Sequence, residues 1–74
     1  MEKLTIKQKM VLEAIEFFIS EKGYSPTIRE IAELTHTSIG PTFQKVFALE
    51  QKGYISTDNG KTRTIKVLKS VEDD

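Results

Sequence analysis

The chain has 74 residues, which is enough for one domain with one modest hydrophobic core. It contains no cysteine, which excludes disulfide bonds and thiolate metal sites, and its longest apolar run is too short to span a bilayer. The first residues do not show the pattern of a signal peptide, so we expect a cytoplasmic protein. The formal net charge is zero, which disfavours purely electrostatic binding to nucleic acid.

The charge is distributed unevenly along the chain. Residues 1–36 are close to neutral, whereas residues 37–71 carry six basic residues against two acids, Glu50 and Asp58. The last three residues are all acidic. We therefore expect one domain over residues 1–69 with a basic second half, followed by an acidic tail over residues 70–74.

The first helix is predicted from Ile6 to Lys22. Thr5, followed three residues later by Gln8, forms a capping-box pattern at its start, and Gly23 suits a left-handed position after its end. Apolar residues at helical spacing predict a buried stripe, and Leu12 lies off this stripe, facing a different element. The predicted stripe consists of Met10, Val11, Ala14, Ile15, Phe18 and Ile19.

The second helix is predicted from Ile28 to Leu34, with Thr27 and Glu30 as a second capping box. The segment 35–37 then forms a tight connection. Its central residue, His36, tolerates a left-handed conformation better than a branched residue would.

The third helix is predicted from Ser38, as its N-cap, to about Lys52, with Pro41 in the first turn and Gly53 after the end. We expect Thr42, Val46 and Leu49 to face inward. Where the three helices meet, the core is expected to contain Phe18, Ile31 and Leu49.

The remaining sequence predicts a β-hairpin. Residues 54–57 and 62–68 are rich in β-branched side chains, and Asn59-Gly60 between them favours a type I′ turn. Ile65 and Val67 would lie on the face that covers the helices. The predicted fold is mainly α with a small hairpin: a winged helix-turn-helix of three helices and a two-stranded wing.

Several stretches resemble the LexA family, in its N-terminal DNA-binding domain. They are Leu4-Thr5 with Gln8, Gly23-Tyr24-Ser25-Pro26-Thr27, Arg29-Glu30-Ile31-Ala32, Leu49-Glu50, Lys52-Gly53-Tyr54-Ile55 and Arg63-Thr64-Ile65. The resemblance covers residues 4–68 and implies a repressor that binds double-stranded DNA.

The chain departs from this family in two respects. The turn and third helix, residues 35–46, match poorly, the segment 31–49 is one residue shorter than usual, and His36 stands where glycine is common. The family's protease half, with its self-cleavage site and catalytic Ser–Lys pair, has no counterpart in these residues. We therefore expect either a stand-alone relative or a fragment, with an operator of its own.

The expected DNA-contacting surface lies on the third helix and the wing. Gln44 has the donor and acceptor that adenine recognition requires, Ile39 or Phe43 can contact a thymine methyl group, and Lys45 suits a phosphate. Lys61 and Arg63 on the wing, and Arg29 on the second helix, are also expected at phosphates. The full set is Arg29, Ser38, Ile39, Gly40, Pro41, Phe43, Gln44, Lys45, Lys61 and Arg63.

Each of these assignments has an alternative. Lys61 and Arg63 can be solvated hairpin charges, and Arg29 can pair with Glu33 one helical turn away. Phe43 and Phe47, also one turn apart, can pack on the wing or first helix. The third helix has one basic residue and an apolar face, so a protein-interaction module is the alternative function.

No catalytic, metal or cofactor site is expected. His36 has no cysteine nearby, and Glu33 alone does not make a metal site, so His36 is interpreted as a turn residue. No catalytic triad or phosphate-binding glycine loop is present. The expected partner is double-stranded DNA, without a membrane. Two copies on a palindromic site and a protein partner are further partners that the sequence leaves open.

Overall fold

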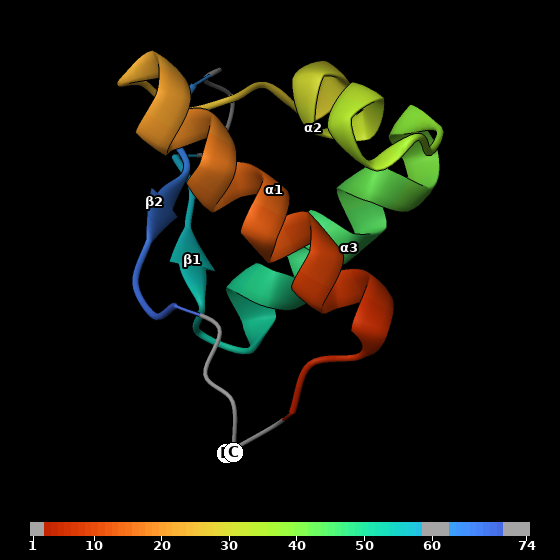
Figure 1. Cartoon of the computed structure of the whole chain (residues 1–74). Helices are drawn as coiled ribbons and strands as arrows, with labels where there is room; N and C mark the ends of the chain where they lie inside the picture. The colour runs from red at the N-terminus through yellow and green to blue at the C-terminus, as the bar shows by residue number, and fades with distance from the viewer. Residues whose placement is uncertain (1–2, 59–62, 71–74) are drawn as a thin grey trace.

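The computed structural model describes residues 3–58 and 63–70. Three helices, α1 (Ile6–Lys22), α2 (Ile28–Thr35) and α3 (Ile39–Gln51), precede two antiparallel strands, β1 (Ile55–Ser56) and β2 (Lys66–Val67). The helices pack against one another, and the strands stand beside the end of α3 (Figure 1). This is the predicted winged helix-turn-helix. Across the described ranges, no helix is long and apolar enough to cross a membrane.

Local signals set the ends of α1. The Thr5 hydroxyl accepts the Gln8 N–H, and the Gln8 side-chain oxygen accepts the Thr5 N–H, both at 3.1 Å. At the other end Gly23 has φ 81°, a left-handed conformation that costs glycine little, and its N–H donates to the Ile19 carbonyl at 2.8 Å. The predicted capping box and stop are confirmed.

The second helix repeats the same start and ends on a histidine. Thr27 and Glu30 exchange the reciprocal capping bonds, at 2.9 and 3.2 Å. The helix ends one residue after the predicted Leu34, and His36 follows with φ 56° and ψ 43°. A non-glycine residue in this left-handed region of backbone angles is strained. His36 adopts the strained conformation at the point where the chain turns from α2 into α3.

The hydrophobic core lies where the helices and the wing meet. Ile65 is buried and Val67 packs against the core, so the predicted inner face of the second strand is confirmed. The buried cluster consists of Val11, Leu12, Ile15, Ile31, Val46, Leu49, Ile55 and Ile65.

Two predictions about α1 need correction, those for Phe18 and Met10. Leu12, which was expected to face a different element, is fully buried in the main cluster. Phe18 is buried outside that cluster, with its ring edge-on to Tyr24 at 5.6 Å. Met10 is 45% exposed, since it faces the gap between α1 and α2 rather than their contact.

The hairpin is confirmed, but its strands are shorter than predicted and their register differs. Ile55 pairs with Val67. A two-residue turn at Asn59-Gly60 between continuous strands would place Ile55 opposite Thr64, three residues away. The predicted turn itself lies outside the described residues. Arg63, with φ 55°, interrupts the extended backbone before β2 begins.

Candidate nucleic-acid interface

A chain of threonine hydroxyls fixes the angle between α2 and α3. Thr35 Oγ1 lies 2.9 Å from the Ile31 carbonyl oxygen and 2.9 Å from Thr37 Oγ1. Thr37 Oγ1 lies 2.7 Å from Thr42 Oγ1, which lies 2.8 Å from the Ser38 carbonyl oxygen. Thr42 is fully buried, and Thr35 and Thr37 are half-buried, so this network crosses the turn partly shielded from solvent. Ser38 occupies the predicted N-cap position, but its side chain makes no capping bond.

The two faces of α3 have different environments. Thr42, Val46 and Leu49 are buried, as predicted for the inward face. Gln44 is exposed, as its rotation of about 200° from Thr42 predicts. The remaining α3 candidates are exposed or half-buried on the outward side: Ser38, Ile39, Gly40, Pro41, Phe43 and Lys45.

The outward face of α3 is notably apolar. Phe43 and Phe47 are 58% and 53% exposed, so neither packs fully on the wing or on α1. Ile39, one turn before Phe43, is 46% exposed. These three residues form a ridge at a spacing of four, which we call the apolar ridge. Lys45 lies beside it, with its ammonium 3.5 Å from the Pro41 carbonyl oxygen.

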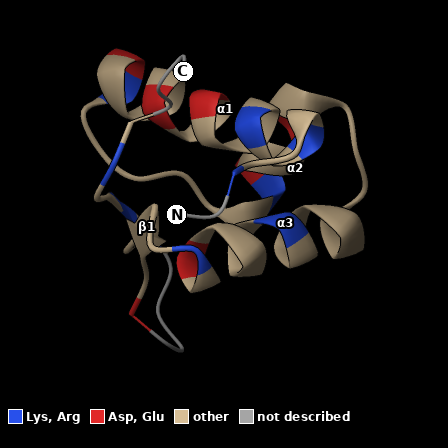
Figure 2. Cartoon of the chain, turned by 90° about the horizontal axis from the view of Figure 1, so that it is seen from below, with Lys and Arg blue, Asp and Glu red and all other residues tan. Residues whose placement is uncertain are grey.

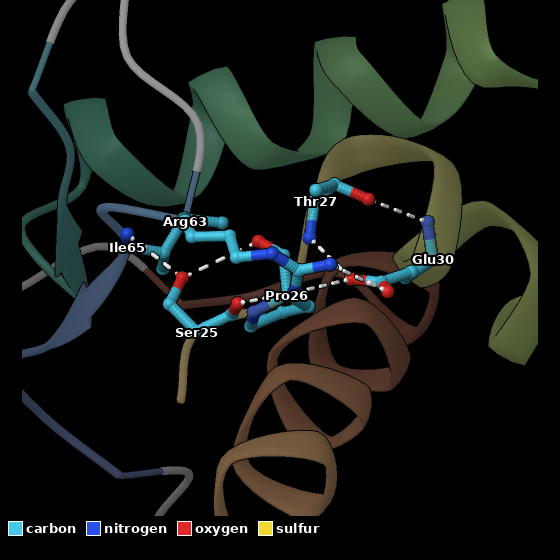
Figure 3. A network of polar contacts seen from close by, with 6 residues as sticks. All are labelled: Ser25, Pro26, Thr27, Glu30, Arg63 and Ile65. Atoms are coloured by element: carbon cyan, nitrogen blue, oxygen red, sulfur yellow. Dashed lines mark hydrogen bonds and ion pairs between the residues drawn. The ribbon is translucent and has the colours of Figure 1, made fainter. Parts of the chain in front are cut away.

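The wing is attached to the start of α2 through Arg63 (Figure 3). The two terminal nitrogens of Arg63 donate to the two carboxylate oxygens of Glu30, each at 3.0 Å. One of these two nitrogens also donates to the Ser25 carbonyl oxygen at 3.2 Å, and the guanidinium lies 4.8 Å from the centre of the Tyr24 ring. In addition, the Ile65 N–H donates to the Ser25 hydroxyl at 3.0 Å. We call this set of contacts the wing clasp.

Charge reinforces the wing clasp. The Arg63 guanidinium, helped by the Thr27 N–H, lowers the pKa of the Glu30 carboxyl below its ordinary value. The hydrogen bond with the Glu30 carboxylate in turn raises the pKa of Arg63, which therefore stays protonated. Arg63 is thus not a merely solvated hairpin charge. Lys61 lies outside the described residues.

The other polar candidates make fewer contacts. Arg29 is exposed, and within residues 3–58 and 63–70 it makes no ion pair with Glu33, so the intrahelical pair that was the alternative to a phosphate contact is not formed. His36 serves as the turn residue, as predicted. The described part of the chain holds no group of three His, Asp or Glu side chains that could bind a metal ion.

The sequence did not identify Tyr24, Ser25 and Glu30 as partners of the wing. They are more than thirty residues from Arg63, so no periodicity or spacing relates them. One signal was available, because residues 23–27, 29–32 and 63–65 are three stretches of the same resemblance. The structure brings these stretches together.

The acidic residues are placed differently on α1 and α3. Figure 2 shows α1 and α3 on opposite sides, with acidic residues along α1. Glu13, Glu16 and Glu21 lie on α1, whereas the outward residues of α3 from Ile39 to Phe47 include no acid. A phosphate backbone would therefore meet no carboxylate along this stretch of α3.

Comparison with known proteins identifies the family. The model of the LexA DNA binding domain matches residues 1–64. The LexA repressor of Thermotoga neapolitana is 46% identical over 72 residues, covering 97% of this chain and 36% of that protein. The LexA repressor of Leptospira biflexa is 39% identical over 74 residues, covering 100% of this chain and 37% of that protein. The chain therefore spans little more than a third of the length of these relatives. With its three helices, its wing and this match over most of its length, the chain belongs to the LexA DNA-binding domain family.

Proposed function

We propose that this chain binds double-stranded DNA sequence-specifically, as the DNA-binding module of a transcriptional repressor in the cytoplasm. The main supporting observation is that α3 is fixed along its inner face and exposed along its outer face. A helix presented in this way fits the width of the major groove. The relatives named LexA repressor support the regulatory role.

Base recognition is assigned to the outward face of α3. Gln44 would make a bidentate contact with an adenine edge, and Ile39 and Phe43 would contact thymine methyl groups. Gly40 and Pro41 lie in the first turn of the helix, where the DNA backbone can approach closely. Ser38 offers an exposed hydroxyl beside them.

Backbone contacts are assigned to four basic residues. Lys45, Lys61 and Arg29 would meet phosphates beside the groove. Arg63 can do so without leaving the wing clasp. The contacts with described residues use three of its five N–H groups, and its side chain is 40% exposed.

A single domain of this size covers few base pairs, so we propose that two copies bind a palindromic site. The apolar ridge is the one observation that would favour the other function, protein binding through α3. Membership of a DNA-binding family favours DNA instead. The same ridge is then explained as a surface for thymine methyl groups.

Selection of bound duplexes from a random pool tests the proposal. We expect enrichment of a specific site, and weak binding to other duplexes that falls as salt rises. Gln44→Ala should lower affinity for the selected site by about 1–3 kcal/mol and leave non-specific affinity nearly unchanged. Gln51→Ala, an exposed glutamine at the end of the same helix, is the matched control. If no duplex is enriched and no salt-dependent binding is found, the proposal is wrong.

Two further measurements separate base contacts from backbone contacts. Deoxyuridine in place of thymine removes only the methyl group, so it should weaken binding of the wild type and have less effect on Phe43→Ala. Lys61→Ala should weaken binding to all duplexes alike and reduce the salt slope by about one. A change of preferred sequence in Lys61→Ala would show that the wing contacts bases.

A further inference from the structure

A second surface, formed by α1 and α2 alone, is exposed and apolar. One hollow of about 290 Å³ is lined by Met10, Glu13, Ala14, Phe17, Leu34 and Thr35. An adjoining hollow of about 300 Å³ is lined by Phe17, Phe18, Glu21, Lys22, Glu30, Glu33 and Leu34. The two share Phe17 and Leu34 and form one continuous groove, which we call the α1–α2 groove.

The groove exposes more apolar surface than isolated surface residues would. Phe17 is 57% exposed, Met10 is 45% exposed and Leu34 is 40% exposed, and the three line the same hollow between α1 and α2. Large side chains gathered in this way mark an interaction site more often than an inert surface. Neither hollow includes a residue of α3 or the wing, and none of the residues assigned to DNA lines the groove, although Glu30 in its wall is bonded to Arg63.

The dimensions of the groove suit a helix. Along α1 it extends from Met10 to Lys22, a rise of about 18 Å, which is roughly three helical turns. The opposite wall is α2, from Glu30 to Thr35. An amphipathic helix binds such a groove by inserting apolar side chains spaced one turn apart. Each hollow is at the lower limit for a small-molecule pocket, which favours side chains of a partner.

Charge specifies the kind of helix. Glu13, Glu21 and Glu33 line the groove, and among residues 3–58 and 63–70 none of these carboxylates has an ion pair. Lys22 is the one basic residue that lines either hollow. A partner with lysine or arginine beside its apolar residues would therefore gain attraction along the rim.

We propose that the α1–α2 groove binds a basic amphipathic helix of a protein partner, on a different side of the molecule from the DNA. The apolar groove supplies the contact area, and the unpaired carboxylates select a basic partner. The site does not depend on α3, so partner and DNA can be bound together. A second copy of this chain is the competing occupant, and the experiment below distinguishes it.

A display library of random 16-residue peptides, selected on the immobilised chain, provides the probe. We expect enriched peptides with large apolar residues three or four positions apart, flanked by lysine or arginine. Phe17→Glu should reduce their affinity at least about tenfold. Ile6→Glu is the matched control, because Ile6 is 79% exposed on the same helix and lies outside the groove. It should leave peptide affinity unchanged.

Further variants keep the test decisive. Leu34→Glu repeats the apolar test from α2, and a thermal melt verifies that each variant folds. The double variant Glu13→Lys/Glu33→Lys should abolish the preference for basic peptides. Bound duplex DNA should not displace the peptide. The proposal would be overturned if no peptides were enriched, or if the enriched peptides were acidic. It would also be overturned if Ile6→Glu lowered peptide affinity as much as Phe17→Glu, or if DNA displaced the peptide. Self-association of the chain that Phe17→Glu abolishes would likewise overturn it.

Discussion

The helices α1 and α2 begin with the same motif, and the two copies make a natural comparison. Thr5 and Gln8 exchange hydrogen bonds at the start of α1, and Thr27 and Glu30 do so at the start of α2. The α1 pair is exposed and the α2 pair is partly buried. In both boxes the third helical residue then accepts a hydrogen bond from a distant cation.

The distant partners differ in kind. The Gln8 side-chain oxygen accepts from the Lys52 ammonium at 2.7 Å, which ties the end of α3 to the start of α1. Glu30 accepts two bonds from Arg63, which ties the wing to the start of α2. A local capping motif can thus become a tertiary joint. Only the joint at α2 combines two charges, so only that joint is expected to respond to pH.

A substitution in the hydrophobic core gives the loss of stability against which the effects at both joints can be compared. Leu49 is fully buried in the cluster that all three helices and the wing share. Leu49→Ala should lower the free energy of unfolding by about 2–5 kcal/mol in urea denaturation, because it leaves a cavity. An effect no larger than that of a capping variant would show that α3 is not held by its core contacts.

Removing the capping hydroxyls compares the two boxes directly. Thr27→Ala should destabilise the protein by about 1–2 kcal/mol, and Thr5→Ala by about 0.5–1 kcal/mol, because a partly buried N–H loses more when it is left unpaired. Urea denaturation at neutral pH measures both, with Thr27→Ser and Thr5→Ser as controls that retain the hydroxyl. Equal effects would mean that burial of the α2 box does not matter.

Glu30→Gln separates capping from ion pairing, because the amide oxygen can still accept the Thr27 N–H. We expect a lower melting temperature at neutral pH. The folded-state pKa of Glu30 lies below the ordinary value of 4.5, so the pair stabilises the protein above that value. This stability is lost as the pH falls through the lowered pKa, and the two melting temperatures should converge there. Glu33→Gln, on the same helix, controls for the loss of a carboxylate. A difference that persists in acid would refute the ionic explanation.

The converse exchange, Gln8→Glu, should make the α1 joint resemble the α2 joint. A carboxylate at this position would accept from Thr5 and form an ion pair with Lys52. The expected gain in stability at low salt is about 0.5 kcal/mol or less, and it should diminish in high salt because exposed ion pairs are screened. Thermal melts of Gln8→Glu with and without Lys52→Met would detect it. A gain that survives the loss of Lys52 would be due to the helix dipole instead.

The features that the sequence predicted well are local ones. Thr5 with Gln8, Thr27 with Glu30, and Gly23 each act over three or four residues, so their effects follow from spacing and residue type. The inward side of α3 was also predictable, because Val46 and Leu49 continue a helical period. The outward position of Gln44 follows from the same rotation.

The features that the sequence missed depend on contacts between distant segments. The wing clasp joins Arg63 to Glu30 across 33 positions. The strand register pairs Ile55 with Val67, which the Asn59-Gly60 signal did not predict. Phe18 has the period of a core residue, yet its contact with Tyr24 arises only once the chain has turned at Gly23. Which outward residues of α3 contact DNA stays a prediction.

The hydroxyl chain across the helix-turn-helix has a consequence for the number of protons available. Thr35, Thr37 and Thr42 supply one hydroxyl proton each, whereas four close oxygen pairs connect them with one another and with the Ile31 and Ser38 carbonyls. At any moment one of these oxygen pairs therefore has no hydrogen bond, and rotation of the hydroxyl groups changes which pair that is. Loss of any one hydroxyl removes one proton and two pairs, so the two remaining protons match the two remaining pairs. Replacing a single threonine by valine would therefore remove one hydrogen bond from the chain of hydroxyls, but would leave every remaining hydroxyl proton with an acceptor.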